Sequence, residues 1–178
     1  MKNTEKQTIL LIEDNTGDSR LIKELLNEIT SFNYQLIIAE TLKEGCEQIK
    51  KNNYVLILLD LNLPDSTGKD TFDTVIKCAE IIPVVLVSGL HDEQLSLSLI
   101  KEGAQDYILK QELNNNILNK TIQFAIERKK HLNEINKKTH QLLEMNSMFT
   151  GREMRMIELK KEVNELLIKL GNEKRCFW

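Results

Sequence analysis

The stretch YVLILLDLNLPDSTG, residues 54–68, decides the fold of this chain. Its first half is an unbroken apolar run ending at Asp60, and such a run is typical of a strand buried on both faces of a parallel sheet. Its second half contains Pro64 and Gly68, which favour turns, so a loop should follow the strand directly. Asp60 therefore lies at the carboxyl end of a predicted strand, where open α/β sheets place their binding sites.

Four other segments resemble this strand in length and composition. The five predicted strands are Thr8–Glu13, Gln35–Glu40, Tyr54–Asp60, Pro83–Ser88 and Asp106–Leu109. The segments between them are amphipathic, and the predicted helices span Gly17–Ser31, Thr41–Lys51, Thr67–Ala79 and Asp92–Glu102. Asp92 fits a helix N-cap, and Gly103 fits a helix stop. This alternation predicts an α/β fold with a doubly wound, five-stranded parallel sheet covered by helices on both faces.

Composition narrows the classes of protein that this chain can represent. Its 178 residues are 41% hydrophobic, enough for one ordinary domain and an extension. The net charge of -3 lacks the basic character typical of nucleic-acid binders, so we expect no direct nucleic-acid contact. The cysteines are odd in number and lack CxxC spacing, which argues against a disulfide framework or a zinc site: Cys46, Cys78 and Cys176. With a polar N-terminus as well, we expect a cytoplasmic protein without membrane insertion.

Beyond Leu113 the sequence loses its strand-like runs and becomes a long amphipathic segment. Apolar residues recur every seven positions at Ile135, Leu142, Phe149, Met156, Val163 and Leu170. A companion series, Met145, Leu159 and Leu166, is interrupted by Lys138 and Arg152. This spacing is typical of a coiled coil, although the same stripe could instead pack on a partner protein.

The predicted domains are therefore 1–126 and a helical extension, 127–178. Gly151 weakens a continuous helix by about 1 kcal/mol relative to Ala, so we expect a break or bend near it. Gly171 fits a helix stop.

Five polar residues stand at or just after strand ends, where the sheet should bring them together: Glu13, Asp14, Asp60, Ser88 and Lys110. Clustered carboxylates repel one another unless a cation binds, and Mg²⁺ prefers oxygen ligands. An aspartate in such a site can attack phosphorus, while a lysine and a hydroxyl can contact phosphoryl oxygens. The pattern predicts a divalent-metal and phosphoryl site.

These motifs resemble the receiver domain of two-component response regulators over about the first 125 residues. The resemblance rests on LLIEDN, LILLDLNLPDSTG, VVLVSG and GAQDYILK, which occur in the family's order. It implies a flavodoxin-like receiver with strand order 2-1-3-4-5. One departure is Gln111, because many family members have proline after the lysine.

The resemblance also implies residue roles. Asp60 would be the phosphoacceptor, and Glu13, Asp14, Asp60 and the backbone carbonyl of Asn62 would hold Mg²⁺. Lys110 and Ser88 would contact the phosphoryl group. Ser88 and Tyr107 would act as switch residues that report phosphorylation by changing position.

The resulting hypothesis is a response regulator, not an enzyme with a separate substrate. It would be phosphorylated by a sensor histidine kinase and signal through protein contact, including homodimerisation through the C-terminal helix. The alternative is a constitutive receiver-like adaptor or dimerisation module whose output does not depend on phosphorylation. A phosphotransfer or phosphatase-like enzyme is the third hypothesis, and no residue of the long helix stands out to support it.

Overall fold

We describe the fold from a computed structural model, which describes residues 7–30, 32–89 and 93–169. The strands are β1 (Gln7–Ile12), β2 (Tyr34–Ala39), β3 (Leu56–Leu59), β4 (Asn62–Leu63), β5 (Ser66–Thr67), β6 (Val84–Ser88) and β7 (Asp106–Leu109). The helices are α1 (Thr16–Glu28), α2 (Leu42–Lys51), α3 (Gly68–Ala79), α4 (Glu93–Lys101), the 3-10 turn η2 (Lys110–Glu112) and α5 (Asn115–Lys169).

The main sheet has five parallel strands in the order β2-β1-β3-β6-β7. Because β4 and β5 form a separate small hairpin, this order corresponds to the predicted 2-1-3-4-5 pattern. The central strands β1 and β3 are in register, with Leu11 paired to Leu58 and Ile12 to Leu59. The predicted doubly wound, flavodoxin-like fold is confirmed.

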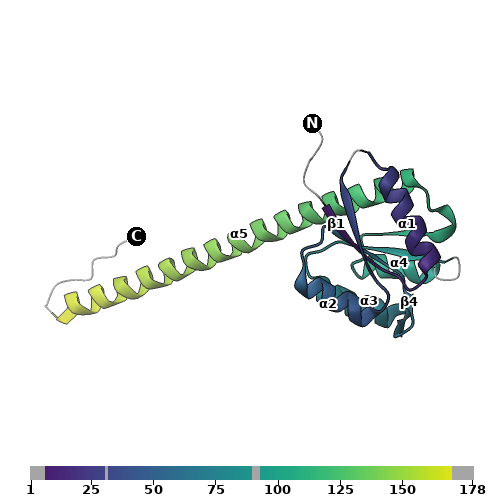
Figure 1. Ribbon diagram of the computed structural model, residues 1–178. Helices are drawn as coiled ribbons and strands as arrows, with labels where there is room; N and C mark the ends of the chain where they lie inside the picture. Colours follow the sequence, from purple (N-terminus) through teal and green to yellow (C-terminus); the bar gives the residue numbers. More distant parts are fainter. Residues whose placement is uncertain (1–6, 31, 90–92, 170–178) are drawn as a thin grey trace. The chain divides into compact units, whose positions relative to one another are not determined.

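Helices cover both faces of the sheet (Figure 1). One face packs against α2, α3 and α4 through buried side chains that include Ile49, Phe72 and Leu99. The other face packs against α1 and the first turns of α5, with Ile22 and Leu118 fully buried. All four residues of β3 are buried, as expected for a strand covered on both sides. The central position of β3 in the sheet thus explains the continuous apolar run before Asp60.

The loop after β3 is more ordered than the sequence predicted. It forms the β4–β5 hairpin, and the Leu61 carbonyl accepts hydrogen bonds from Gly68 N at 2.8 Å and from Thr71 Oγ1 at 3.1 Å. Gly68 has a φ of 60°, a conformation that favours glycine at the start of α3. Asp65 accepts hydrogen bonds from the first amides of α2. These contacts fix the loop that follows Asp60.

The chain divides into two compact units, residues 1–132 and 133–178, and the boundary predicted at 126 lies within the first. The helix α5 is continuous through Gly151, where the sequence predicted a break or bend. The helix is therefore not broken at Gly151, because the cost of one glycine, about 1 kcal/mol, does not interrupt a helix of 55 residues, and the expected bend stays a prediction.

Several predictions fall outside the described residues: those for Asp92, Leu170, Gly171 and Cys176. Cys46 in α2 and Cys78 in α3 are free thiols whose Sγ atoms lie 3.4 Å apart. Within the described ranges, no helix combines the length and the apolar character needed to cross a membrane.

Candidate functional site

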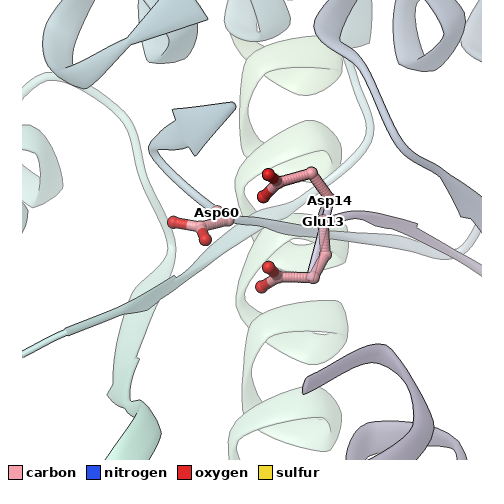
Figure 2. Close-up of side chains that lie close together, drawn as sticks. All are labelled: Glu13, Asp14 and Asp60. Carbon is pink, nitrogen blue, oxygen red and sulfur yellow. The ribbon is translucent and has the colours of Figure 1, made fainter. Parts of the chain in front are cut away.

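Three carboxylates meet at the carboxyl ends of β1 and β3. Glu13 and Asp14 directly follow β1, and Asp60 directly follows β3, so the pairing of these two strands brings the acids together. One oxygen of each lies within 4.8 Å of the others (Figure 2). Glu13 and Asp60 are buried, with exposed fractions of 1% and 5%, whereas Asp14 is exposed. The sequence predicted this cluster, and the structure brings its members together.

Lys110 lies at the centre of the acidic residues. It follows β7, and its Nζ lies 2.8 Å from Glu13 Oε2 and 2.7 Å from Asp60 Oδ2. Its third partner is Asp18 Oδ2, also at 2.8 Å. The three N–H groups of one ammonium thus face three carboxylates. The single positive charge of Lys110 does not by itself balance the four carboxylates, Glu13, Asp14, Asp18 and Asp60.

Burial and charge shift the protonation of two of these groups. The pKa of Glu13 is raised to about 7, chiefly by burial; the hydrogen bond from Lys110 acts to lower it, and the nearby charge of Asp60 acts to raise it. For Lys110, burial lowers the pKa, but hydrogen bonds to Asp18, Asp60 and Glu13 outweigh burial and raise the pKa above its usual value. Lys110 is therefore positively charged at neutral pH, whereas Glu13 gains or loses its proton close to neutral pH.

Asp18 is the site residue that sequence reasoning missed. It lies in the first turn of α1, where Asn15 is the N-cap: Asn15 Oδ1 accepts hydrogen bonds from Gly17 N at 2.8 Å and Asp18 N at 3.2 Å. This cap starts the helix so that Asp18 faces Lys110. The only sequence signal was an acidic residue in a predicted first helical turn, which is also an ordinary way to complement the helix dipole.

Asp60 is held from two sides. Asn62 N donates a hydrogen bond to Asp60 Oδ1 at 3.1 Å, while Lys110 binds Oδ2. The expected role of the Asn62 carbonyl as a metal ligand stays a prediction. The two bonds orient the Asp60 carboxylate, whose side chain is 7% exposed.

The two proposed switch residues lie on neighbouring strands. Ser88 ends β6 and is fully buried, and Ser96 Oγ in α4 donates a hydrogen bond to Ser88 Oγ at 3.0 Å. Tyr107 lies on β7 and is half-buried against the side of the core that contains α2, α3 and α4. Their predicted switching role remains a prediction. Ser96 is a partner that the sequence did not single out.

The donor set fits a hard divalent cation. Carboxylate oxygens are the ligands that Mg²⁺ prefers, and it binds one or two of them while keeping several waters. Glu13, Asp14 and Asp60 offer such oxygens at one edge of the sheet. The carboxylates could thus hold a cation that neutralises the remaining negative charge.

Comparison with known proteins agrees with this geometry. A family model described as the response regulator receiver domain matches residues 9–122, more than half of the chain. The cell cycle response regulator CtrA of Brucella ovis is 28% identical over 162 residues, covering 85% of this chain and 68% of the relative. The cell cycle transcriptional regulator CtrA of Caulobacter vibrioides is 32% identical over 102 residues, covering 57% of this chain. This chain spans only 43% of the Caulobacter relative's length.

Solved structures show the same architecture. A response regulator receiver domain protein from Clostridium thermocellum matches 71% of this chain and 98% of its own, with 26% identity and a TM-score of 0.62. Its coverage indicates that the likeness concerns a whole receiver domain. The matched family, the parallel sheet and the acidic cluster lead to one conclusion: this chain belongs to the response regulator receiver domain family.

Proposed function

We propose that this response regulator accepts a phosphoryl group on Asp60 from a sensor histidine kinase. The observation that carries the proposal is the setting of Asp60: its Oδ2 is 2.7 Å from Lys110 Nζ, and two further carboxylates lie beside it. An Asp60 oxygen would form a bond to phosphorus as the bond from phosphorus to the kinase's imidazole nitrogen breaks. The product is an acyl phosphate that water later hydrolyses.

The surrounding residues have distinct proposed roles. Asn62 N–H orients the Asp60 carboxylate for attack, and Lys110 pairs with a phosphoryl oxygen once the group has been transferred. The Ser88 hydroxyl donates to a second phosphoryl oxygen. Mg²⁺, held by Glu13, Asp14, Asp60 and the Asn62 carbonyl, would neutralise charge on the phosphoryl oxygens.

The proposed output is protein contact. Ser88 and Tyr107 lie on the adjacent strands β6 and β7, so a shift of Ser88 toward the phosphoryl group can change how Tyr107 packs. This is a two-state equilibrium biased by a covalent charge. The net charge of -3 supports protein contact rather than direct nucleic-acid binding by this chain.

Phosphoryl acceptance is tested with acetyl phosphate and Mg²⁺, followed by intact-mass measurement of the full chain. We expect a gain of one phosphoryl group, which Asp60→Asn abolishes and which chelation of Mg²⁺ prevents. Asp70→Asn removes an exposed carboxylate in the first turn of α3 and is the matched control that should still be phosphorylated. Equal labelling of the Asp60→Asn variant would refute the assignment.

The adaptor hypothesis needs a separate test. Light scattering of the chain with Mg²⁺, with or without beryllofluoride as a phosphoryl mimic, reports whether the site controls assembly. A change in mass that Asp60→Asn removes supports phosphorylation-dependent output. Unchanged assembly, together with partner regulation that survives Asp60→Asn, supports the constitutive adaptor instead.

A further inference from the structure

The second unit presents an apolar stripe along α5 whose members are about half exposed. At the core positions of the heptad pattern, the exposed fractions are 56% for Phe149, 58% for Met156, 44% for Leu159, 45% for Val163 and 57% for Leu166. These side chains belong to one helix and repeat at the spacing of a coiled-coil seam. The stripe is thus available to a second helix.

Two hollows lie along this stripe. One is lined by Met156, Leu159, Lys160 and Val163, and the other by Met145, Met148, Phe149 and Arg152. In a coiled coil, each core side chain inserts between four residues of the facing helix. The lining residues of each hollow are spaced i, i+3, i+4 and i+7, which is the spacing of such a four-residue set. The surface therefore matches a partner that is itself a heptad helix.

Charge decides how a second copy of this chain would lie on the stripe. In a parallel, in-register pair, Arg152 would face the partner's Arg152 in the core, and Arg155 would flank the partner's Lys160. Both arrangements bring like charges together, and the first does so at a position removed from water. A parallel homodimer is disfavoured.

We propose that residues 145–169 bind a second copy of the same segment in antiparallel orientation, centred between Ile157 and Glu158. Met156 then packs against the partner's Leu159, and Phe149 against the partner's Leu166. Each hollow receives an apolar side chain: the partner's Met156 enters the first, and the partner's Leu166 enters the second.

The charges are complementary in this arrangement. Arg152 packs its aliphatic stem against the partner's Val163 while its guanidinium reaches solvent. Glu153 lies beside the partner's Lys160, and Arg155 beside the partner's Glu162. Twofold symmetry makes each of these pairs occur twice.

Neighbouring antiparallel registers lack this complementarity. A shift by one heptad in one direction places Glu153 beside the partner's Glu153 and Arg155 beside the partner's Arg155. The opposite shift does the same for Lys160 and Glu162. A shift by two heptads would place the partner's Arg152 in the hollow beside Phe149. The proposed register alone among these four fills both hollows with apolar side chains and pairs opposite charges.

Charge reversal tests the orientation and the register together. Neither Glu153 nor Lys160 has a charged residue three or four positions away in the helix, so their substitution disturbs no such pair within the helix. Lys160→Glu and Glu153→Lys should each raise the dimer dissociation constant roughly tenfold, because two attractive pairs become repulsive. The double variant, which keeps the composition and net charge of the parent, should restore the parental value.

The measurement is sedimentation equilibrium of the full chain at low ionic strength. A parallel pair predicts the opposite sign for Lys160→Glu, because Arg155 would gain an acidic neighbour on the partner. Tighter association of that variant, failure of the double variant to restore association, or a monomer at every concentration would each overturn the proposal. None of these outcomes depends on phosphorylation of Asp60, so each is distinct from a failure of the proposed function.

Discussion

Lys110→Met should destabilise the metal-free protein by about 3 kcal/mol at pH 8. The lysine side chain is 22% exposed, while its partners Glu13 and Asp60 have side-chain exposures of 0% and 7%. Removing one member of a buried ion pair costs about 3–5 kcal/mol, because the remaining charge is left without compensation. Because Lys110 is partly exposed, we expect a loss of stability at the lower end of this range.

Two conditions should reduce this loss. The pKa of Glu13 is about 7 in the parent and should rise further without Lys110, so at pH 5 the folded variant holds Glu13 neutral. Millimolar Mg²⁺ should also restore stability, because a cation bound only by the folded state stabilises it by mass action. Urea unfolding at pH 8 and pH 5, with and without Mg²⁺, measures these effects.

Lys69→Met is the matched control. Lys69 pairs with Glu102 on the surface, where side-chain exposures are 49% and 44%. Such exposed pairs contribute about 0–1 kcal/mol, so this variant should be nearly as stable as the parent under all four conditions. Equal losses in the two variants, or a loss for Lys110→Met that neither acid nor Mg²⁺ reduces, would refute the electrostatic account.

Three further predictions concern Glu13 and two glycines in helices, Gly45 and Gly151. The folded-state pKa of Glu13 is raised from 4.5 to about 7, so protonated Glu13 contributes fully to the free energy of unfolding below pH 4.5. As the pH rises toward 7, the metal-free protein loses this contribution, which is about 3 kcal/mol. Glu13→Gln should remove this pH dependence in urea unfolding, and an unchanged slope would contradict the assignment. Gly45→Ala should destabilise by about 1–3 kcal/mol, because its Cβ would lie 2.5 Å from Cδ1 of the buried Ile12. Gly151→Ala has open space and should instead stabilise α5 by up to about 1 kcal/mol, measured by amide exchange around that residue.

The sheet and much of the site could be predicted because they depend on a local pattern. Apolar runs identify the strands, and parallel strands share one carboxyl edge, so Asp60 and Lys110 could be placed together although 50 residues separate them. The fold class predicts that the first and third strands are neighbours at the centre of the sheet. This pairing predicts that Glu13 lies beside Asp60.

Other features depend on geometry that no local pattern contains. The approach of Asp18 to Lys110 follows from the path of α1 after its Asn15 cap, and the hydrogen bond of Ser96 to Ser88 follows from the packing of α4 against β6. The β4–β5 hairpin is too short to give a strand pattern. At Gly151 the helix continues where a break or bend was expected, because helix propensity is a weak preference over one residue; a bend there stays a prediction.

The ammonium of Lys110 donates hydrogen bonds to Asp18 and Asp60, and its Nζ also lies 2.8 Å from Glu13 Oε2, so three carboxylates surround its three donors. Any new acceptor, such as the phosphoryl group proposed for Asp60, must therefore compete for one of these donors. Asp18 is the partner that water can most readily replace, because its side chain is 33% exposed. A covalent event at the end of β3 should then loosen the first turn of α1, which faster amide exchange there would reveal and unchanged exchange would contradict. Lys110 would thus couple the end of β3 to the first turn of α1, two parts of the chain that are not joined by strand pairing.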